Sequence, residues 1–147
     1  MSENHRMIVH RGGESRPTRI PLPPDYQIKA GTEDTEGRFS FLEVAVTHDI
    51  PRHIHHTDDE AFYLLEGELE VEFEGEKYSV TPGMFMLLPH GVPHQVKVVS
   101  QTPPRLLQVS SPGGFEHFLE DLIEVQSDGD PEKFAAVSAK HRWSILP

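Results

Sequence analysis

HIHHTDDEAFYLLEG, residues 53–67, places histidines and acids close together just before an apolar run. His53 and His55 are two residues apart, so in a β-strand both imidazoles emerge on the same face. Glu60 follows after a turn-like segment, where a reversal of the chain returns it beside the two histidines. Spacing alone fits a metal site and a solvated His-rich loop equally well, because such turns are common on protein surfaces.

A second stretch, GMFMLLPHGVPH at residues 83–94, supplies a further imidazole. Its apolar run and its Pro-Gly turn deliver His94 to the start of the next strand. Two imidazoles from one strand, a carboxylate across a turn and an imidazole from a neighbouring hairpin would surround a divalent ion in a barrel mouth. The chain has no cysteine, so the donors are nitrogen and oxygen, which suit Fe, Mn, Ni, Cu, Co or Zn.

Short strand patterns separated by turn residues run from Tyr26 to about residue 110. ELEVEF, residues 68–73, alternates strictly between acidic and apolar residues, as a half-buried antiparallel strand does. RFSFLEVAV, residues 38–46, has apolar residues on both faces, which predicts a strand covered on two sides. Many short strands punctuated by Gly and Pro predict an all-β sandwich or barrel.

The last third of the chain changes to helical spacing. In GFEHFLEDLIEV, residues 114–125, Phe118 and Leu119 belong to an apolar stripe, while Glu116 and Glu120 are expected mainly on the other face. DPEKFAAVSAKH carries a second helix signal, with an Asp N-cap followed by Pro at the first helical position. Helices are therefore predicted to pack against the outside of the barrel.

The domain organisation follows from these patterns. At 147 residues the chain fits one domain. The charged, proline-rich beginning is predicted to be an extended arm, either without fixed structure or paired with a neighbouring subunit. The predicted parts are an arm at 1–24 and one domain at 25–147, with a barrel core at about 37–110 and a helical segment at 114–141.

Both quoted stretches resemble the two sequence motifs of the cupin superfamily. The first motif, H-x-H, four residues, E, six residues, G, is carried by His53, His55, Glu60 and Gly67. The second, G, five residues, P-x-G, two residues, H, is carried by Gly83, Pro89, Gly91 and His94. The resemblance implies a small double-stranded β-helix, or jelly-roll, barrel that usually forms a homodimer. It also implies one divalent metal ion bound by His53, His55, Glu60 and His94.

Two positions depart from the family motifs, and the flanking segments narrow the resemblance. Thr47 and Val98 replace a Gly and an Asn of the motifs; neither position is a metal ligand in the family. The flanks GTEDTEGRFSFLEV and LLQVSSPGGFEHFLEDL resemble those of single-domain cupins grouped with quercetin 2,3-dioxygenase. This likeness implies a metal-dependent dioxygenase for a flavonol-like or enolisable aromatic or diketone compound, with Glu60 as ligand and catalytic base.

Two further functions are compatible with the same motifs. One is a non-oxidative polyketide cyclase or isomerase, in which a Lewis-acidic ion polarises a carbonyl group. The other is a small-molecule-binding cupin without catalysis, because a fold alone does not fix a function. Side chains on the same strand face as Glu60 and His94 would form either the core or an apolar pocket wall: Phe62, Leu64, Val96 and Val98.

Several polar residues near the motifs have simpler interpretations. His56 and His90 are expected on the surface, and Gln108 is expected to point outward rather than into the pocket. Asp58 and Asp59 are interpreted as turn residues, although either can instead accept a hydrogen bond from a ligating histidine.

Net charge bears on the partners of the chain. With 13 basic and 24 acidic residues the formal charge is −11, which repels phosphate backbones and anionic membrane surfaces. No apolar run approaches the roughly 18 residues of a membrane span, and the N-terminus has no apolar signal-peptide core. We therefore expect a cytoplasmic protein that binds a small apolar aromatic or ketone molecule, and neither nucleic acid nor membrane.

Overall fold

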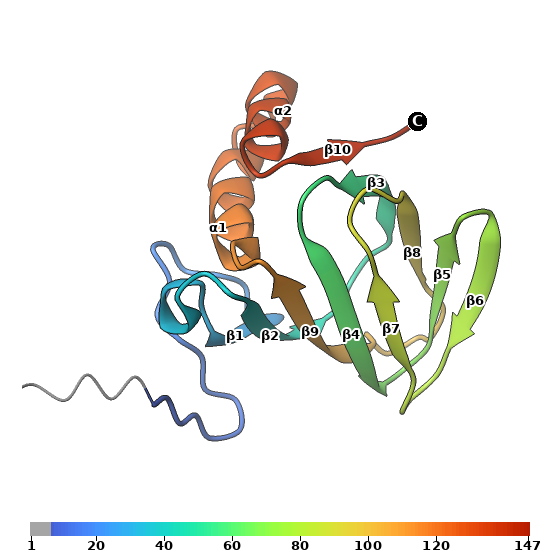
Figure 1. Ribbon diagram of the computed structural model, residues 1–147, viewed down its shortest axis with the longest axis horizontal. Coiled ribbons are helices and arrows are strands. Elements are labelled where there is room, and N and C mark those ends of the chain that lie inside the picture. The colour runs from blue at the N-terminus through green and yellow to red at the C-terminus, as the bar shows by residue number, and fades with distance from the viewer. Residues whose placement is uncertain (1–6) are drawn as a thin grey trace, which may run out of the picture.

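The computed structural model describes residues 7–147, so the first six residues of the predicted arm lie outside the described part. Two antiparallel sheets face each other and form a small barrel, with two helices at one side (Figure 1). The first sheet has the order β1-β2-β9-β4-β7: Tyr26–Ala30, Ser40–Ala45, Arg105–Ser111, Asp59–Glu66 and Phe85–Leu88. The second has the order β10-β3-β8-β5-β6: Trp143–Ile145, Ile50–His55, His94–Val98, Leu69–Phe73 and Glu76–Val80. The predicted all-β barrel is confirmed.

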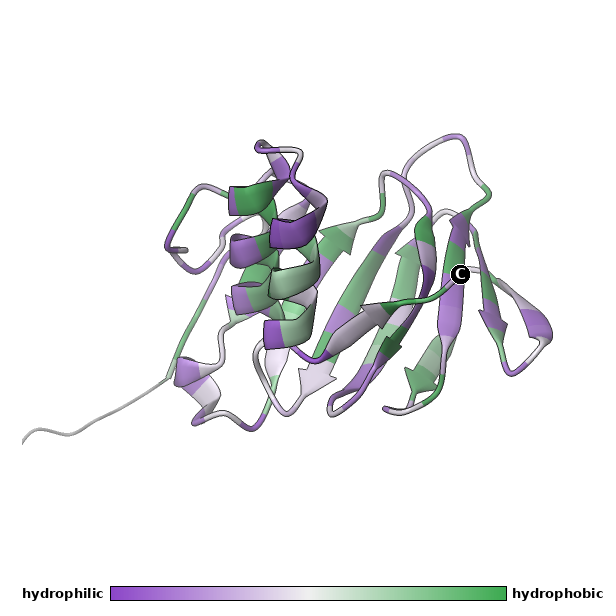
Figure 2. Cartoon of the chain, turned by 90° about the horizontal axis from the view of Figure 1, so that it is seen from above, coloured by the Kyte–Doolittle hydropathy of each residue, from purple (hydrophilic) through white to green (hydrophobic). Residues whose placement is uncertain are grey.

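Alternating hydropathy along the strands explains the two-layer arrangement (Figure 2). In β5 the side chains of Leu69 and Val71 are fully buried between the sheets, while Glu70 and Glu72, which alternate with them, are half-buried. In β2 the residues on one face are buried and those on the other are half-buried. The prediction that this strand is covered on both sides is therefore wrong for the single chain.

The two predicted helices are α1, Phe115–Gln126, and α2, Pro131–Lys140, and Asp130 caps α2 by accepting a hydrogen bond from the Glu132 amide. The prediction that Glu116 and Glu120 face outward is wrong, because both are buried. Glu116 accepts hydrogen bonds from the Thr32 amide and hydroxyl. Glu120 accepts hydrogen bonds from the Arg19 amide and from His117. Since each carboxylate meets donors from another segment, helical spacing alone assigned them to the wrong face.

A short C-terminal strand was not predicted from the sequence. β10 pairs antiparallel with β3, with Trp143 opposite His55. Two further backbone bonds flank this pairing: the His56 amide donates to the Arg142 carbonyl at 2.9 Å, and the Leu146 amide donates to the Arg52 carbonyl at 2.8 Å. The last residues of the chain therefore run across the end of the barrel where β3 lies (Figure 1).

The described part of the arm, residues 7–24, contains no helix or strand. It lies against the domain of the same chain. Arg16 donates two hydrogen bonds to Asp34, at 2.5 and 2.6 Å, and Arg19 reaches Asp121 on α1 at 2.7 Å. These contacts attach residues 16–19 to the body of the domain. In the described part of the chain, no helix is long and apolar enough to cross a membrane.

Candidate metal centre

Three strands bring the four predicted ligands to one end of the barrel. His53 and His55 lie on β3 with one residue between them, so both imidazoles point inward. His94 opens β8 and lies directly opposite His53 in the strand register. Glu60 reaches the group from β4 after the Asp-rich turn. One ligand atom from each of the four lies within 4.8 Å of the others.

The donor atoms of the cluster converge closely. His53 Nε2 and His55 Nε2 are 3.1 Å apart. Glu60 Oε2 lies 3.1 Å from His55 Nε2 and 3.6 Å from His94 Nε2. The three histidines are each only 2% exposed, so these polar atoms face one another away from bulk solvent.

Hydrogen bonds behind two of the rings fix which nitrogen faces the cluster. The Nδ1–H of His53 donates to the Pro51 carbonyl at 2.7 Å, and Nδ1 of His55 lies 2.9 Å from an Asp58 carboxylate oxygen. When Nδ1 carries the proton, the inward Nε2 keeps its lone pair, as a metal ligand requires. Of the two interpretations of Asp58, the structure supports the hydrogen-bond partner. Asp59 instead pairs with the exposed His90.

His94 provides a test of whether the cluster fits a metal ion. Neither of its ring nitrogens has a hydrogen-bond partner within the described residues, although the ring is buried. Burying an unpaired imidazole costs stability, and a ligand bound at Nε2 would remove part of that cost. Three imidazoles and one carboxylate around a common centre therefore fit a divalent transition ion.

The pKa values show strong coupling within the cluster. Burial lowers the pKa of His53 to about 4, and the neighbouring His94 acts in the same direction. Burial alone would also lower the pKa of His55, but Asp58 and Glu60 outweigh it and raise this pKa to about 9. Burial favours the neutral form of Glu60, yet the neighbouring imidazoles of His55 and His94 hold its pKa well below the usual range. Glu60 is therefore ionised at neutral pH.

An apolar cavity of about 70 Å³ adjoins the cluster, and Glu60 lies in its wall. Of the predicted pocket residues, Phe62 and Val96 line this cavity. Leu64 and Val98 do not line it: Leu64 is fully buried in the core, and Val98 packs against that core. Strand parity identified the correct face, but it did not reveal where along each strand the cavity ends.

Two residues of this region were not predicted from the sequence to belong to the site. Gln108, expected to point outward, is buried in the cavity wall, and its amide nitrogen has no partner among residues 7–147. It shares the inward face of β9 with Leu106 and Ser110, and this alternation could have revealed it. Trp143 stacks on His53 with ring centroids 4.5 Å apart, and its own neighbours in sequence gave no signal of this contact. His56, as predicted, is exposed.

Comparison with known proteins agrees with this fold and these residues. The family model described as Cupin domain matches residues 40–110, which include all four cluster residues. Residues 40–110 are thus a cupin domain. It is 29% identical over 112 residues to quercetin 2,3-dioxygenase of Bacillus subtilis, covering 72% of this chain and 30% of that protein.

Two other relatives extend the comparison. Protein MJ1618 of Methanocaldococcus jannaschii is 32% identical over 72 residues, covering 49% of this chain and 57% of that protein. The structure of KdgF from Halomonas sp. superposes with a TM-score of 0.54 at 24% identity, covering 67% of this chain and 90% of that one. The match to KdgF shows a shared fold. This chain spans less than two thirds of the length of either curated relative.

Proposed function

We propose that this cupin is a metal-dependent dioxygenase acting on a flavonol-like or enolisable aromatic or diketone molecule. The observation that carries the proposal is the double position of Glu60. Its carboxylate belongs to the His-rich cluster and also lines the apolar cavity. The same carboxylate thus lies both at the candidate ion site and in the wall of the cavity that would hold a substrate.

A divalent ion held by His53, His55, Glu60 and His94 would supply Lewis acidity and, if redox-active, electron transfer to O2. The protein contributes the proton chemistry. Because the pKa of Glu60 is lowered, its carboxylate is available at neutral pH to accept the proton of an acidic enol hydroxyl. Asp58 keeps the ring of His55 oriented while this happens.

The rest of the cavity matches an apolar molecule that carries oxygen atoms. Phe62, Val96, Leu106 and Phe115 offer apolar walls that exclude water from the reacting face. Gln108 places an unpaired amide N–H group on the same wall. That donor is suited to a carbonyl oxygen next to the hydroxyl group that Glu60 deprotonates.

The similarity to quercetin 2,3-dioxygenase supports this choice of chemistry. It covers 72% of this chain, but only 30% of that enzyme. The substrate class is therefore part of the proposal, and it calls for a direct test.

The test is oxygen uptake by protein loaded in turn with Fe, Mn, Ni, Cu or Co, using a flavonol as substrate. We expect uptake by the wild-type chain and at least a hundredfold loss in His53→Ala and Glu60→Gln, of the order measured when catalytic groups are removed. His90→Ala is the matched control, because this histidine is exposed, pairs with Asp59 and should leave uptake unchanged. Equal uptake in all four proteins would refute the proposal.

The same assay separates the alternative functions. Turnover of a ketone or flavonol substrate under strict anaerobiosis would identify a cyclase or isomerase instead. Tight binding of a phenolic compound without any turnover would identify a binding protein. Either result excludes the dioxygenase.

A further inference from the structure

We propose that Trp143 is a positioning residue for the metal centre. It holds the imidazole rings of His53 and His55 in the orientation in which their Nε2 atoms converge. The inference rests on the metal centre of the proposed function. It concerns β10, which lies outside the residues 40–110 that match the family model.

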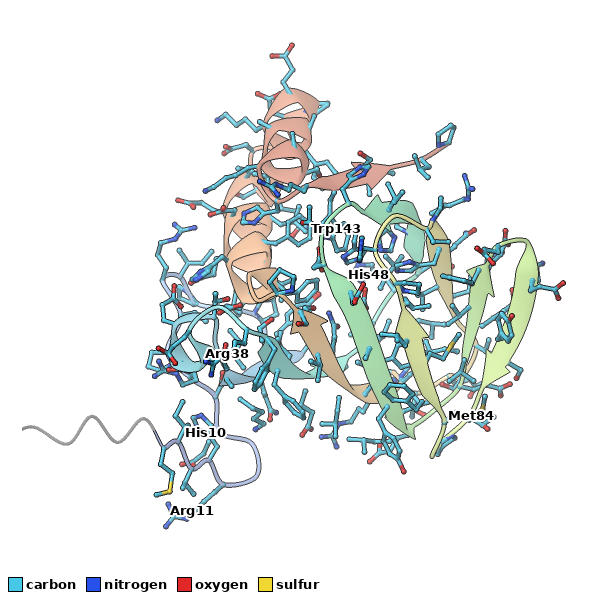
Figure 3. The ribbon with its side chains drawn as sticks, viewed as in Figure 1. His10, Arg11, Arg38, His48, Met84 and Trp143 are labelled. Atoms are coloured by element: carbon cyan, nitrogen blue, oxygen red, sulfur yellow. The ribbon has the colours of Figure 1, made fainter. Side chains whose placement is uncertain are left out.

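The indole of Trp143 contacts both imidazoles of β3. Its ring lies 4.5 Å from that of His53, centroid to centroid, with the planes only 11° apart. The ring of His55 is 4.0 Å away and inclined by 55°. Figure 3 shows Trp143 beneath β10, directed toward the end of the barrel. A single side chain thus forms a common wall behind two predicted ligands.

Stacking on Trp143 restrains the tilt of the imidazole rings, which the hydrogen bonds alone do not fix. The bonds from His53 to Pro51 and from His55 to Asp58 fix one nitrogen of each ring. They leave a ring free to tilt about that point, since the last torsion of a histidine is broad. A flat indole packed parallel to His53 opposes this tilt. The contact therefore sets the ring plane, and with it the direction of the Nε2 lone pair.

Trp143 also packs against the helical segment. The ring of Phe118 on α1 stacks on the indole, with ring centroids 4.4 Å apart and the planes 28° from parallel. Two residues before Trp143, the C-cap residue of α2, His141, contacts Asp121 of α1 at 2.6 Å. These contacts transmit the position of the helices to the indole, so the ring is a fixed surface and not a loosely packed side chain.

The backbone of β10 fixes the register of this contact. Trp143 lies opposite His55 and Ile145 opposite His53 in the antiparallel pair. On the outer side, His56 and Ser144 share a hydrogen bond of 2.8 Å. A shift of β10 by one residue would turn the indole to the other face. The pairing therefore places Trp143 on the same sheet face as the two histidines, where its indole meets both imidazoles.

The probe is Co(II) added alone to the full-length chain after removal of metal by chelation. The variants are Trp143→Ala and Trp143→Phe, and Leu119→Ala is the matched control. Leu119 is buried in the core on α1, so its truncation destabilises the fold without removing the stacked ring. Three readouts are measured: the Kd for Co(II), its visible spectrum, and unfolding temperature. In proteins that keep Trp143, the only tryptophan of the chain, quenching of its fluorescence by Co(II) is a fourth.

We expect Trp143→Ala to weaken Co(II) binding by about 10–100-fold, the range for loss of groups that orient metal ligands. Its visible spectrum should also change, because the ligand geometry does. Trp143→Phe, which restores a flat ring, should recover most of the affinity. Leu119→Ala should lower the unfolding temperature and keep the wild-type Kd and spectrum. Wild-type fluorescence should fall on addition of Co(II), because the indole lies next to two of its ligands.

Two results would overturn the inference while leaving the proposed function intact. One is a Trp143→Ala protein with the Kd and spectrum of the wild type. The other is an equal loss of affinity in Leu119→Ala, which would assign the effect to general stability. Failure of the wild-type chain to bind Co(II) would overturn both proposals. Normal Co(II) binding without oxygen uptake by any metal-loaded form would overturn only the dioxygenase.

Discussion

Replacing His94 by Leu should stabilise the metal-free protein. The imidazole is 2% exposed, and neither of its nitrogens has a hydrogen-bond partner in the described chain. Removing a buried unpaired polar group recovers about 1–3 kcal/mol. Against this, the 3.6 Å approach of His94 to Glu60 is lost, an interaction that we set at about 1 kcal/mol. The net expectation is a gain of about 0–2 kcal/mol, or up to roughly 8 °C in unfolding temperature for a chain of this size.

The same substitution should abolish stabilisation by metal. An ion at 100 times its Kd raises the stability of the native state by about 2.7 kcal/mol. The order of stability against unfolding therefore reverses. The His94→Leu protein is the more stable in chelator, and the wild type is the more stable with saturating metal. We expect this crossover of a residue that binds metal and that destabilises the metal-free fold.

Thermal unfolding in chelator and in excess Co(II) or Zn(II) measures both effects. His90→Leu is the matched control, because this histidine lies in the same turn but is exposed and contacts only the surface carboxylate of Asp59. It should change stability by no more than about 0.5 kcal/mol in either condition. The reasoning is refuted if His94→Leu is less stable than the wild type in chelator, or if metal stabilises it as strongly.

Three further predictions address stability and assembly. Partial burial alone would raise the pKa of Asp121, but the hydrogen bond from Lys140 outweighs it and lowers this pKa to about 2. The resulting stability is fully present above the pKa of about 4 that Asp121 has in the unfolded chain, and it is lost as pH falls toward 2. Asp121→Asn should remove about 1 kcal/mol of this stability. Urea unfolding at pH 7 and pH 3 measures the loss. Gly67→Ala should destabilise by at least about 2 kcal/mol, because φ is +81° and a Cβ would lie 2.7 Å from Pro104 Cα; unchanged urea unfolding would contradict this. For the homodimer that the cupin resemblance implies, Phe85→Glu should halve the molar mass in light scattering, since this ring is 63% exposed; an unchanged mass would place the interface elsewhere.

Local patterns predicted the features of this protein that depend on neighbours in sequence. The two-residue spacing of His53 and His55 puts them on one face of β3 because side chains alternate along a strand. The helix start at Asp130 followed from its side chain and the next proline, and the structure shows that cap. The motif glycine at residue 67 adopts a positive φ at a close approach of two segments, where a side chain does not fit.

Tertiary contacts decided what those patterns could not. Glu116 and Glu120 have the polarity of a solvent-facing helix surface, yet donors from residues 19 and 32 bury them. The alternation of β9 could have placed Gln108 on the inward face, but the cavity that it lines is formed with residues of other strands and of α1. In each case the partner or cavity comes from a segment remote in sequence, which local spacing does not specify.

The sequence by itself therefore determined the barrel and the four residues that converge at one end of it, because motif spacing sets strand faces and turn positions. The tertiary structure alone decided what surrounds them. It placed β10 beside β3, across 88 residues of sequence between His56 and Ser144, and so brought an indole onto two imidazoles. A three-residue edge strand carries too little hydropathy pattern to be recognised. Its position follows from the unpaired backbone of β3 and from the helices that deliver it there.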